Sequence, residues 1–315
     1  MLTYIVKRLA VAVPTLLLLI VISFLLMHAA PGGPFTQERA LPQVVIDNLN
    51  AKYGLDQPLW KQMITYVWGI VGHFDFGPSF VYKDRTVNEI IAQGFPVTLT
   101  YGAVSFVFAV LIGVSLGVAA AIRHNTILDY FAVGLSIGAQ VLPNFVMGPL
   151  LVLLFVLLRG AFAYFADWPL GGWTGSEPHW QYVVMPVIAL STSFMASISR
   201  ITRSSMLEVL HSNHIRTARA KGLPGYKIIL RHALKPAMLP VLSYLGPAFV
   251  LMITGSVVVD MIFSTGGIGK SFVDSALNRD YAVMLGVTIL VGTLTILFNL
   301  LVDILYAWID PKIRL

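Results

Sequence analysis

The chain of 315 residues contains no cysteine and little charge. The absence of cysteine excludes disulfide bonds, thiolate metal sites and cysteine nucleophiles. Charged residues make up 11% of the chain, against roughly 25% in soluble domains, while hydrophobic residues make up 57%. A soluble fold of this composition would have too few polar residues to cover its surface. Composition therefore predicts a polytopic integral membrane protein.

The groups that membrane enzymes and pumps need are also missing from the sequence. The apolar runs hold no Ser/His/Asp grouping and no paired carboxylates, which argues against a membrane protease or lipid hydrolase. Gly269-Lys270-Ser271 resembles the end of a phosphate-binding loop, but Ser264 stands where that pattern needs glycine. His211 and His214 have the spacing of a metal pair on a helix, yet no third ligand lies beside them. We therefore predict no cofactor or metal in this chain, and a partner must supply the energy for any transport.

Six apolar runs are long enough to cross a membrane as helices. They cover about 9–29, 98–122, 130–157, 183–205, 239–262 and 283–307. Pro143 and Pro149 are expected to bend the third run. A cleaved signal peptide is the alternative for the first run, although the run is longer than a usual signal core and Pro31 follows the small residues at its end. The predicted fold class is an all-α integral membrane protein with six transmembrane helices.

The positive charges predict the orientation. With six spans, 13 of the 21 Lys and Arg residues fall on the side that holds both termini. Because Lys and Arg concentrate on the inner side, both termini are predicted to be cytoplasmic. The net charge of +6 is thus interpreted as membrane orientation and not as nucleic-acid binding.

The long polar region follows the first span and is predicted to be external. We divide the chain into a start and first helix (1–30), an external, periplasmic region (31–97) and a core of helices 2–6 (98–315) with an inner loop at 206–240. Residues 57–71 predict an amphipathic helix. Its apolar face comprises Leu59, Met63, Tyr66, Val67 and Ile70. The helix either lies on the membrane surface or packs over the mouth of a pore, and packing is favoured because basic residues are sparse there.

A basic stretch interrupts the apolar sequence between the fourth and fifth spans. It reads NHIRTARAKGLPGYKIILRHALKPAMLP over residues 213–240. Asn213 is the expected N-cap, Gly222 the left-handed residue after the helix and Pro224 the stop. Ala218 and Ala220 have little side-chain bulk, so a partner protein can approach the backbone closely. We predict a short cytoplasmic docking helix, with a basic loop held to anionic lipid heads as the alternative.

Two acids, Asp260 and Asp303, lie near the ends of the fifth and sixth spans. Each is either a functional residue or a hydrated one.

Several motifs together resemble the permeases of peptide-type ABC importers, over nearly the whole chain. His214 to Leu223, followed by Arg231-His232-Ala233-Leu234, is similar to the cytoplasmic coupling loop of that family. Further likeness lies in Ala30-Pro31-Gly32, Thr202-Arg203-Ser204-Ser205-Met206, Asn278-Arg279-Asp280-Tyr281, Asn299-Leu300-Leu301-Val302-Asp303 and Asp310-Pro311-Lys312-Ile313-Arg314. Within the family, Asp75-Phe76-Gly77-Pro78-Ser79 and Gly246-Pro247-Ala248 resemble the B-type subunit of oligopeptide importers.

The resemblance implies a non-enzymatic transport subunit, multi-pass in the bacterial cytoplasmic (inner) membrane, that imports oligopeptides. The implied partners are a homologous C-type permease, two cytoplasmic ABC ATPases that bind ATP and Mg, an external peptide-binding protein and the lipid bilayer, with no nucleic acid. The implied ATPase-coupling residues are Ile215, Arg216, Thr217, Ala218, Arg219, Ala220, Lys221 and Gly222. The candidates for the translocation path or external gate are Asp260, Asn278, Arg279 and Asp280.

Alternative functions are a permease for dipeptides, murein peptides, nickel or glycans, a membrane-embedded enzyme, and a passive channel. The sequence also departs from the family pattern in two places. Arg216-Thr217-Ala218 replaces the Glu-Ala-Ala opening of the general coupling loop, as is usual in the peptide branch. Asp260 replaces a common glutamate, and Ser264-Thr265-Gly266 replaces a proline-containing turn, which puts the geometry of that turn in doubt.

Overall fold

The computed structural model describes residues 2–29, 47–48, 50–51, 54–173, 180–254 and 257–309. All regular elements in these ranges are helical, as predicted, and an isolated bridge joins Pro78 and Thr86. Five described helices are long and apolar enough to cross a membrane, or six if one bent pair counts as a single span. The Ala30-Pro31-Gly32 motif, the C-terminal motif at 310–314 and the side chain of Asp303 lie outside the described part of the chain.

The chain forms two compact units. One unit comprises Met1–Thr98 and Gly266–Leu315, and the other comprises Leu99–Thr265. Helix α4 (Val87–Ile122) begins in the first unit and continues into the second. This division differs from the predicted core of 98–315, because the last helix of the chain groups with the N-terminal segment.

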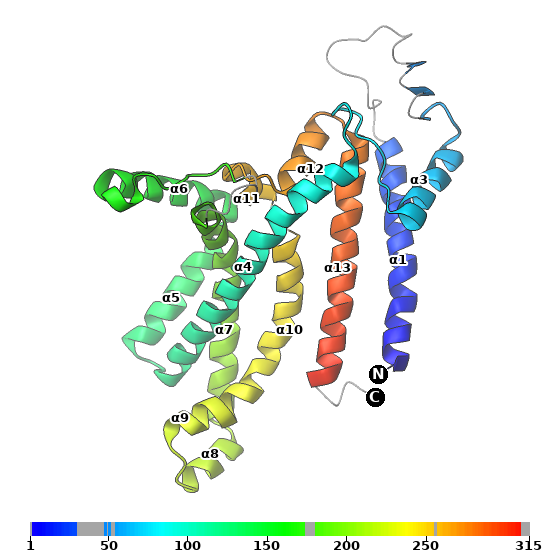
Figure 1. Cartoon of the computed structure of the whole chain (residues 1–315). Helices are drawn as coiled ribbons and strands as arrows, with labels where there is room; N and C mark the ends of the chain where they lie inside the picture. The colour runs from blue at the N-terminus through cyan, green and yellow to red at the C-terminus, as the bar shows by residue number, and fades with distance from the viewer. Residues whose placement is uncertain are drawn as a thin grey trace. The chain divides into compact units, whose positions relative to one another are not determined.

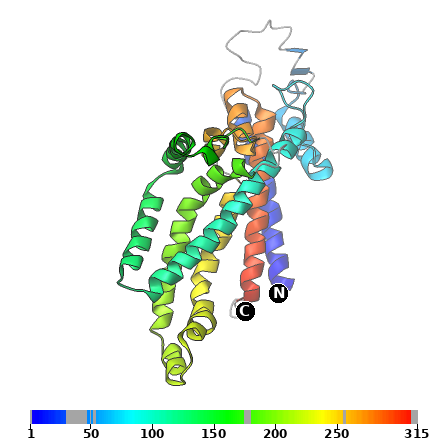
Figure 2. The same ribbon diagram turned by 60° about the vertical axis from the view of Figure 1, so that its left-hand side comes forward.

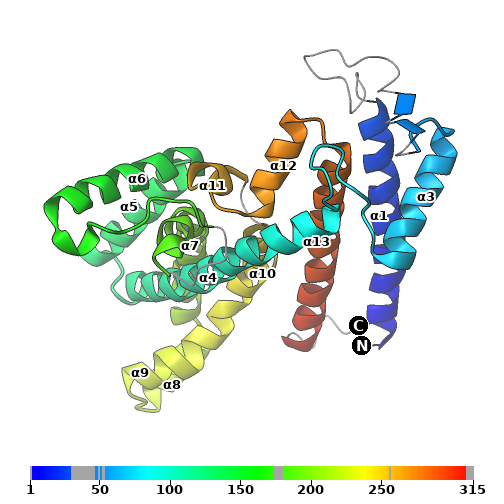
Figure 3. The ribbon, with the colours of Figure 1, turned by 45° about the horizontal axis from the view of Figure 1, so that its top comes forward.

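In the first unit, α1 (Leu2–Ala29) and α13 (Tyr281–Ile309) run side by side, and α3 (Leu59–His73) lies against the later part of α1 (Figures 1 and 3). Ile20 of α1, Ile70 of α3 and Ile289 of α13 form a buried cluster, against which Tyr66 and Val67 pack. The predicted helix therefore exists. Its other side is also apolar, so it is not amphipathic as predicted, but it packs through the predicted apolar face. Leu59 is the exception on that face, since it is 53% exposed.

A second cluster of this unit joins the start of α4, α12 (Ile268–Leu277) and α13. Its buried members are Val87, Ile90, Ile268, Ala282, Val283 and Val287. The backbone N–H of Ile268 also donates to Thr98 Oγ1 at 3.0 Å. The glycine-rich turn at 266–269 thus leads into a short helix, as the sequence predicts, and that helix is anchored to α4.

The second unit continues from α4 through a series of helices built around α7 (Gln181–Leu210), which packs against α5, α6 and α10 (Figure 2). The remaining elements are α5 (Ile127–Val141), α6 (Asn144–Ala161), a 3₁₀ turn (Ala163–Phe165), α8 (Asn213–Ala220), α9 (Gly225–Lys227), a π-helical segment η2 (Ile228–Ala233), α10 (Leu234–Ile253) and α11 (Val257–Ile262). The bend predicted at Pro143 is confirmed, because α5 and α6 meet there at 111°. Proline has no N–H to continue the helical ladder and restricts the residue before it. Helix α6 runs on through Pro149.

Glycines allow α4 to lie directly on α7. A Cβ atom added at Gly113 would stand 2.8 Å from the Met195 carbonyl oxygen, and one at Gly117 would stand 2.5 Å from the Ser199 carbonyl oxygen. Small residues permit such close approach between membrane helices, where packing replaces the hydrophobic effect as the source of association.

We predict that Gly117→Ala forces α4 away from α7, because the obstacle to the new methyl group is backbone. Overpacking of this kind costs about 1–3 kcal/mol, so the thermal unfolding midpoint of the purified protein should fall. Gly134→Ala is the matched control, since a Cβ atom at Gly134 meets nothing within 4 Å. Equal midpoints for the two variants would contradict the close contact.

Candidate coupling surface and buried carboxylates

Helix α8 is a short helix with well-defined ends. It begins at Asn213, with Ser212 as the N-cap, one residue before the predicted cap. After its last residue the chain turns at Gly222, whose φ of +73° is the left-handed conformation predicted for it. The N–H of Leu223 donates to the Ala218 carbonyl at 3.4 Å, and the N–H of Gly222 donates to the Arg219 carbonyl at 2.9 Å. These bonds close the helix and let the chain reverse.

One side of α8 is buried in its own unit. Ile215 is fully buried and Ala218 is 6% exposed. They share a cluster with residues from α4, α7, η2 and α10, namely Ala121, Met206, Ile228, Ala233 and Ala237. This corrects the expected role of Ala218, whose small side chain was assigned to close approach by a partner. The alanine instead lets α8 pack closely on its own chain.

The opposite side of α8 is exposed. Of the eight predicted coupling residues, the six that are not buried are Arg216, Thr217, Arg219, Ala220, Lys221 and Gly222. Three of these carry positive charge, and two of the three, Arg219 and Lys221, lie at the end of the helix, where the helix dipole favours cations. Figures 1 and 2 show α8 at the end of its unit, beyond α7 and α10. The exposed side is therefore a basic face on a protruding helix, and the buried side holds this helix against its own unit.

The sequence did not reveal the π-helical segment between α8 and α10. Ile228 and Ala233 are five residues apart, and both are buried in the cluster beneath α8. Residues at this spacing share a face only when the helix is widened to the i→i+5 pattern, and such segments are rare. No residue pattern in 228–233 signals this conformation.

The two histidines around α8 have separate partners in the chain. His211 Nδ1 lies 2.7 Å from the Leu207 carbonyl oxygen, and His214 Nδ1 lies 2.9 Å from Ser212 Oγ.

A buried ion pair lies near this end of the second unit, and sequence reasoning missed it. Asp129 of α5 is 1% exposed. Arg203 of α7 donates to it through Nε at 2.5 Å and through Nη2 at 2.8 Å. His124 Nδ1 lies 3.1 Å from the same carboxylate, and the N–H of Asn125 donates to it at 3.0 Å. A bidentate pair of this kind is strong and directional. It joins α5 and the turn before it to α7, one helical turn before Met206 of the cluster beneath α8.

Asp260, the first gate candidate, is buried in the second unit. The Tyr101 hydroxyl donates to its Oδ1 at 2.9 Å, the Thr265 hydroxyl donates to the same carboxylate, and the Thr265 N–H donates to the Asp260 carbonyl at 3.0 Å. The carboxylate thus joins α11 to α4 and to the turn at 263–265. Of the two alternatives for Asp260, the hydrated one does not fit its full burial.

The other gate candidates belong to the first unit. Asp280 is fully buried before α13 and accepts the Ser79 hydroxyl, the Phe80 N–H at 3.2 Å and the Val283 N–H at 3.3 Å. It therefore caps α13 and fastens a loop some 200 residues earlier in the chain. Asn278 and Arg279 are exposed, and Arg279 has a left-handed φ of +57°.

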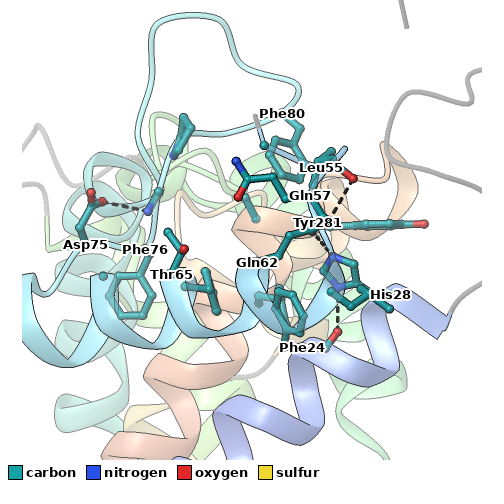
Figure 4. Close-up of a pocket in the computed structure, with 18 of the residues that line it drawn as sticks. Phe24, His28, Leu55, Gln57, Gln62, Thr65, Asp75, Phe76, Phe80 and Tyr281 are labelled. Carbon is teal, nitrogen blue, oxygen red and sulfur yellow. Dashed lines mark hydrogen bonds between the residues drawn. The ribbon is translucent and has the colours of Figure 1, made fainter. Parts of the chain in front are cut away.

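A cavity of about 750 Å³ lies in the first unit between α1, α3, residues 75–80 and the start of α13 (Figure 4). Aromatic side chains line much of it, namely Phe24, Tyr66, Phe76, Phe80 and Tyr281. Gln62 is fixed at its wall, because its amide donates to the Gln57 carbonyl at 2.7 Å while its oxygen lies 3.2 Å from His28 Nε2. No residue pattern indicates this cavity, since its walls come from segments far apart in the chain.

Comparison with known proteins relates the chain to transport proteins along its whole length. Residues 113–315 match the inner membrane component of binding-protein-dependent transport systems, and residues 1–102 match the N-terminal part of such components. The chain is 53% identical to the oligopeptide transport system permease protein OppB of Haemophilus influenzae and 55% identical to that of Salmonella typhimurium, with both chains covered completely. It is 41% identical to the dipeptide transport system permease protein DppB of Bacillus subtilis, over 99% of this chain and 98% of that protein.

We predict that Arg203→Gln destabilises the second unit, because it leaves the buried carboxylate of Asp129 without its cation. An unsatisfied buried polar group costs on the order of 2 kcal/mol, which should appear as a lower thermal unfolding midpoint. Arg200→Gln removes the same charge from an exposed position of the same helix and serves as the control. If the two variants unfold at the same midpoint, the ion pair does not stabilise the unit.

Proposed function

This chain belongs to the family of inner membrane components of binding-protein-dependent transport systems, and on that premise we propose that it is the permease subunit of an ABC importer that moves oligopeptides into the cell. The observation that carries the proposal is the identity of 53–55% to oligopeptide permeases over the full length of both chains. The lower identity of 41% to a dipeptide permease makes dipeptide import the second candidate.

We propose a complex with a homologous C-type permease, two cytoplasmic ABC ATPases and an external peptide-binding protein. The ATPases bind ATP and Mg, and this chain supplies the path and the mechanical link. The orientation follows from the charge distribution: α8 and both termini face the cytoplasm, where 13 of the 21 Lys and Arg residues then lie.

The exposed face of α8 is the proposed contact with an ATPase, and its buried face carries the motion inward. When ATP binding closes the ATPases, α8 is displaced as a rigid body. Ile215 and Ala218 lie in one cluster with residues of α4, α7 and α10, so a displacement of α8 moves the ends of these helices. The Asp129–Arg203 pair extends the link to α5. Helices that shift between two packed arrangements switch access from one side of the membrane to the other.

Transport by the reconstituted complex tests the proposed cargo. The complex of this chain with its native partners, placed in liposomes with its binding protein outside and ATP inside, should accumulate labelled tetra- and pentapeptides. Labelled dipeptides and nickel should compete poorly. Preferential accumulation of dipeptides would favour the second candidate, and ATP-independent entry that stops at equal concentrations inside and outside would indicate a passive channel.

Gly222→Asp should uncouple ATP hydrolysis from uptake, because it adds a negative charge to the proposed docking face. A loss of about 1.4 kcal/mol in docking corresponds to about tenfold weaker binding. Nothing lies within 4 Å of a Cβ atom at this position, so the substitution is accommodated within the chain itself apart from its φ of +73°. Gly222→Asn is the matched control, since asparagine has nearly the same shape, tolerates left-handed backbone and is neutral. The measurement is peptide transported per ATP hydrolysed, and an unchanged ratio in the aspartate variant would refute docking at this face.

A further inference from the structure

Helix α3 is apolar on both sides. Its inner side packs in the cluster with Ile20 and Ile289. Its outer side carries a stripe of large apolar side chains, each more than half exposed, namely Trp60, Ile64, Trp68, Val71 and Phe74 at its end. The spacing of three and four residues places these side chains on one face of the helix. Lys61 is the only Lys, Arg, Asp or Glu within 59–73. The outer stripe is therefore suited to an apolar environment.

The contacts of α3 place it level with the membrane-spanning part of α1. Gln62 meets His28 at 3.2 Å, the rings of Tyr66 and Phe24 are 5.8 Å apart, and Ile70 shares a buried cluster with Ile20. Each successive contact therefore lies four residues further along α3 and four residues earlier along α1. The candidate membrane span of α1 is Leu9–Ala29. At about 1.5 Å per residue, Ile20 lies about 13 Å inside the end of that span. Figure 1 shows α3 beside α1 in this antiparallel direction.

The backbone N–H groups of the turn that follows α3 have hydrogen-bond partners. The N–H groups of Phe74 and Asp75 donate to the Ile70 and Gly69 carbonyls at 3.1 and 3.0 Å. The Phe76 N–H donates to Asn88 Oδ1 at 2.9 Å. The Asn88 side chain in turn donates from Nδ2 to the Phe74 carbonyl at 2.6 Å.

The Gly77 N–H also has a partner, because it donates to Asp75 Oδ1 at 2.9 Å. The carboxylate of Asp75 therefore takes part in the turn and lines the cavity of Figure 4. Non-helical backbone at membrane depth requires such partners, because water is absent there and each unpaired group costs several kcal/mol. A turn held in this way is compatible with a position below the membrane surface.

We propose that α3 and the turn at 74–77 dip into the bilayer beside α1, with the stripe of Trp60, Ile64, Trp68, Val71 and Phe74 in contact with lipid. Exposed apolar side chains of α1 in the same half of its span, including Ile22, Leu25 and Leu26, provide a similar surface beside it. Trp60, which lies level with the end of the α1 span, suits the boundary between acyl chains and headgroups, where tryptophan is enriched. This inference goes beyond the proposed function and depends on neither the cargo nor the ATPases.

The absence of cysteine makes the proposal directly testable. Ile64→Cys and Thr65→Cys each give one site for a nitroxide spin label. The two positions are neighbours on α3, but Ile64 belongs to the stripe and Thr65 lines the cavity. The complex, with cysteine-free partners, is placed in vesicles of phosphatidylethanolamine and phosphatidylglycerol. Collision rates of each label are measured with oxygen, which concentrates in lipid, and with a neutral nickel chelate, which stays in water.

The label at position 64 should collide several-fold more often with oxygen than with the chelate, and the label at position 65 should show the reverse preference. Trp68→Cys, a second position on the stripe, should repeat the result of position 64 and serves in its place if Ile64→Cys does not assemble. Preference for the chelate at both stripe positions would mean that the stripe faces water. Low collision rates with both reagents would mean that a partner protein covers it. Either of these results would overturn the proposal.

Discussion

The packing of Ile215 and Ala218 beneath α8 is the contact on which the proposed coupling depends. A helix of eight residues has little stability of its own, since isolated helices of this length are marginal in water. Its position is therefore set by its buried face, which lies against α7, η2, α10 and the end of α4. A loose helix would absorb a push by bending or fraying. A helix seated on the ends of three long helices passes the displacement to all of them.

Buried carboxylates connect other elements of the molecule through hydrogen bonds. Asp129 joins α5 to α7, Asp260 joins α11 to α4, and Asp280 joins the start of α13 to the loop at 79–82. Each is almost inaccessible to solvent and each has several donors. An acid in or near a membrane span is by default a functional candidate, and in the structure these three also hold separate elements together. Their geometry joins elements that are far apart in the sequence, at points where water does not compete for the hydrogen bonds.

Much of the fold could be predicted from the sequence, because long apolar runs, prolines and capping residues act locally. The spans, the bend at Pro143, the helix after α1 with its packed face and the left-handed turn at Gly222 all follow from residues within a few positions of each feature. What could not be predicted depends on contacts between distant segments. Nothing near Ala218 shows that it packs within its own chain and not against a partner, and nothing near Asp129 identifies Arg203 as its ion pair. The π-helical turn at 228–233 places both Ile228 and Ala233 in the cluster beneath α8, where they meet residues of distant helices.

The bilayer explains why such polar contacts stabilise so much of this structure. Lipid tails are as apolar as leucine, so burying an apolar side chain between two membrane helices gains little over leaving it in lipid. Specific association must come from close backbone approach and from hydrogen bonds. Gly113 and Gly117 provide the first where α4 lies on α7, and the three buried carboxylates provide the second. The outer stripe of α3 is consistent with the same balance, because a large apolar face is costly only where it meets water. The fold therefore concentrates its specificity in a few small and polar residues and leaves wide apolar surfaces to the lipid.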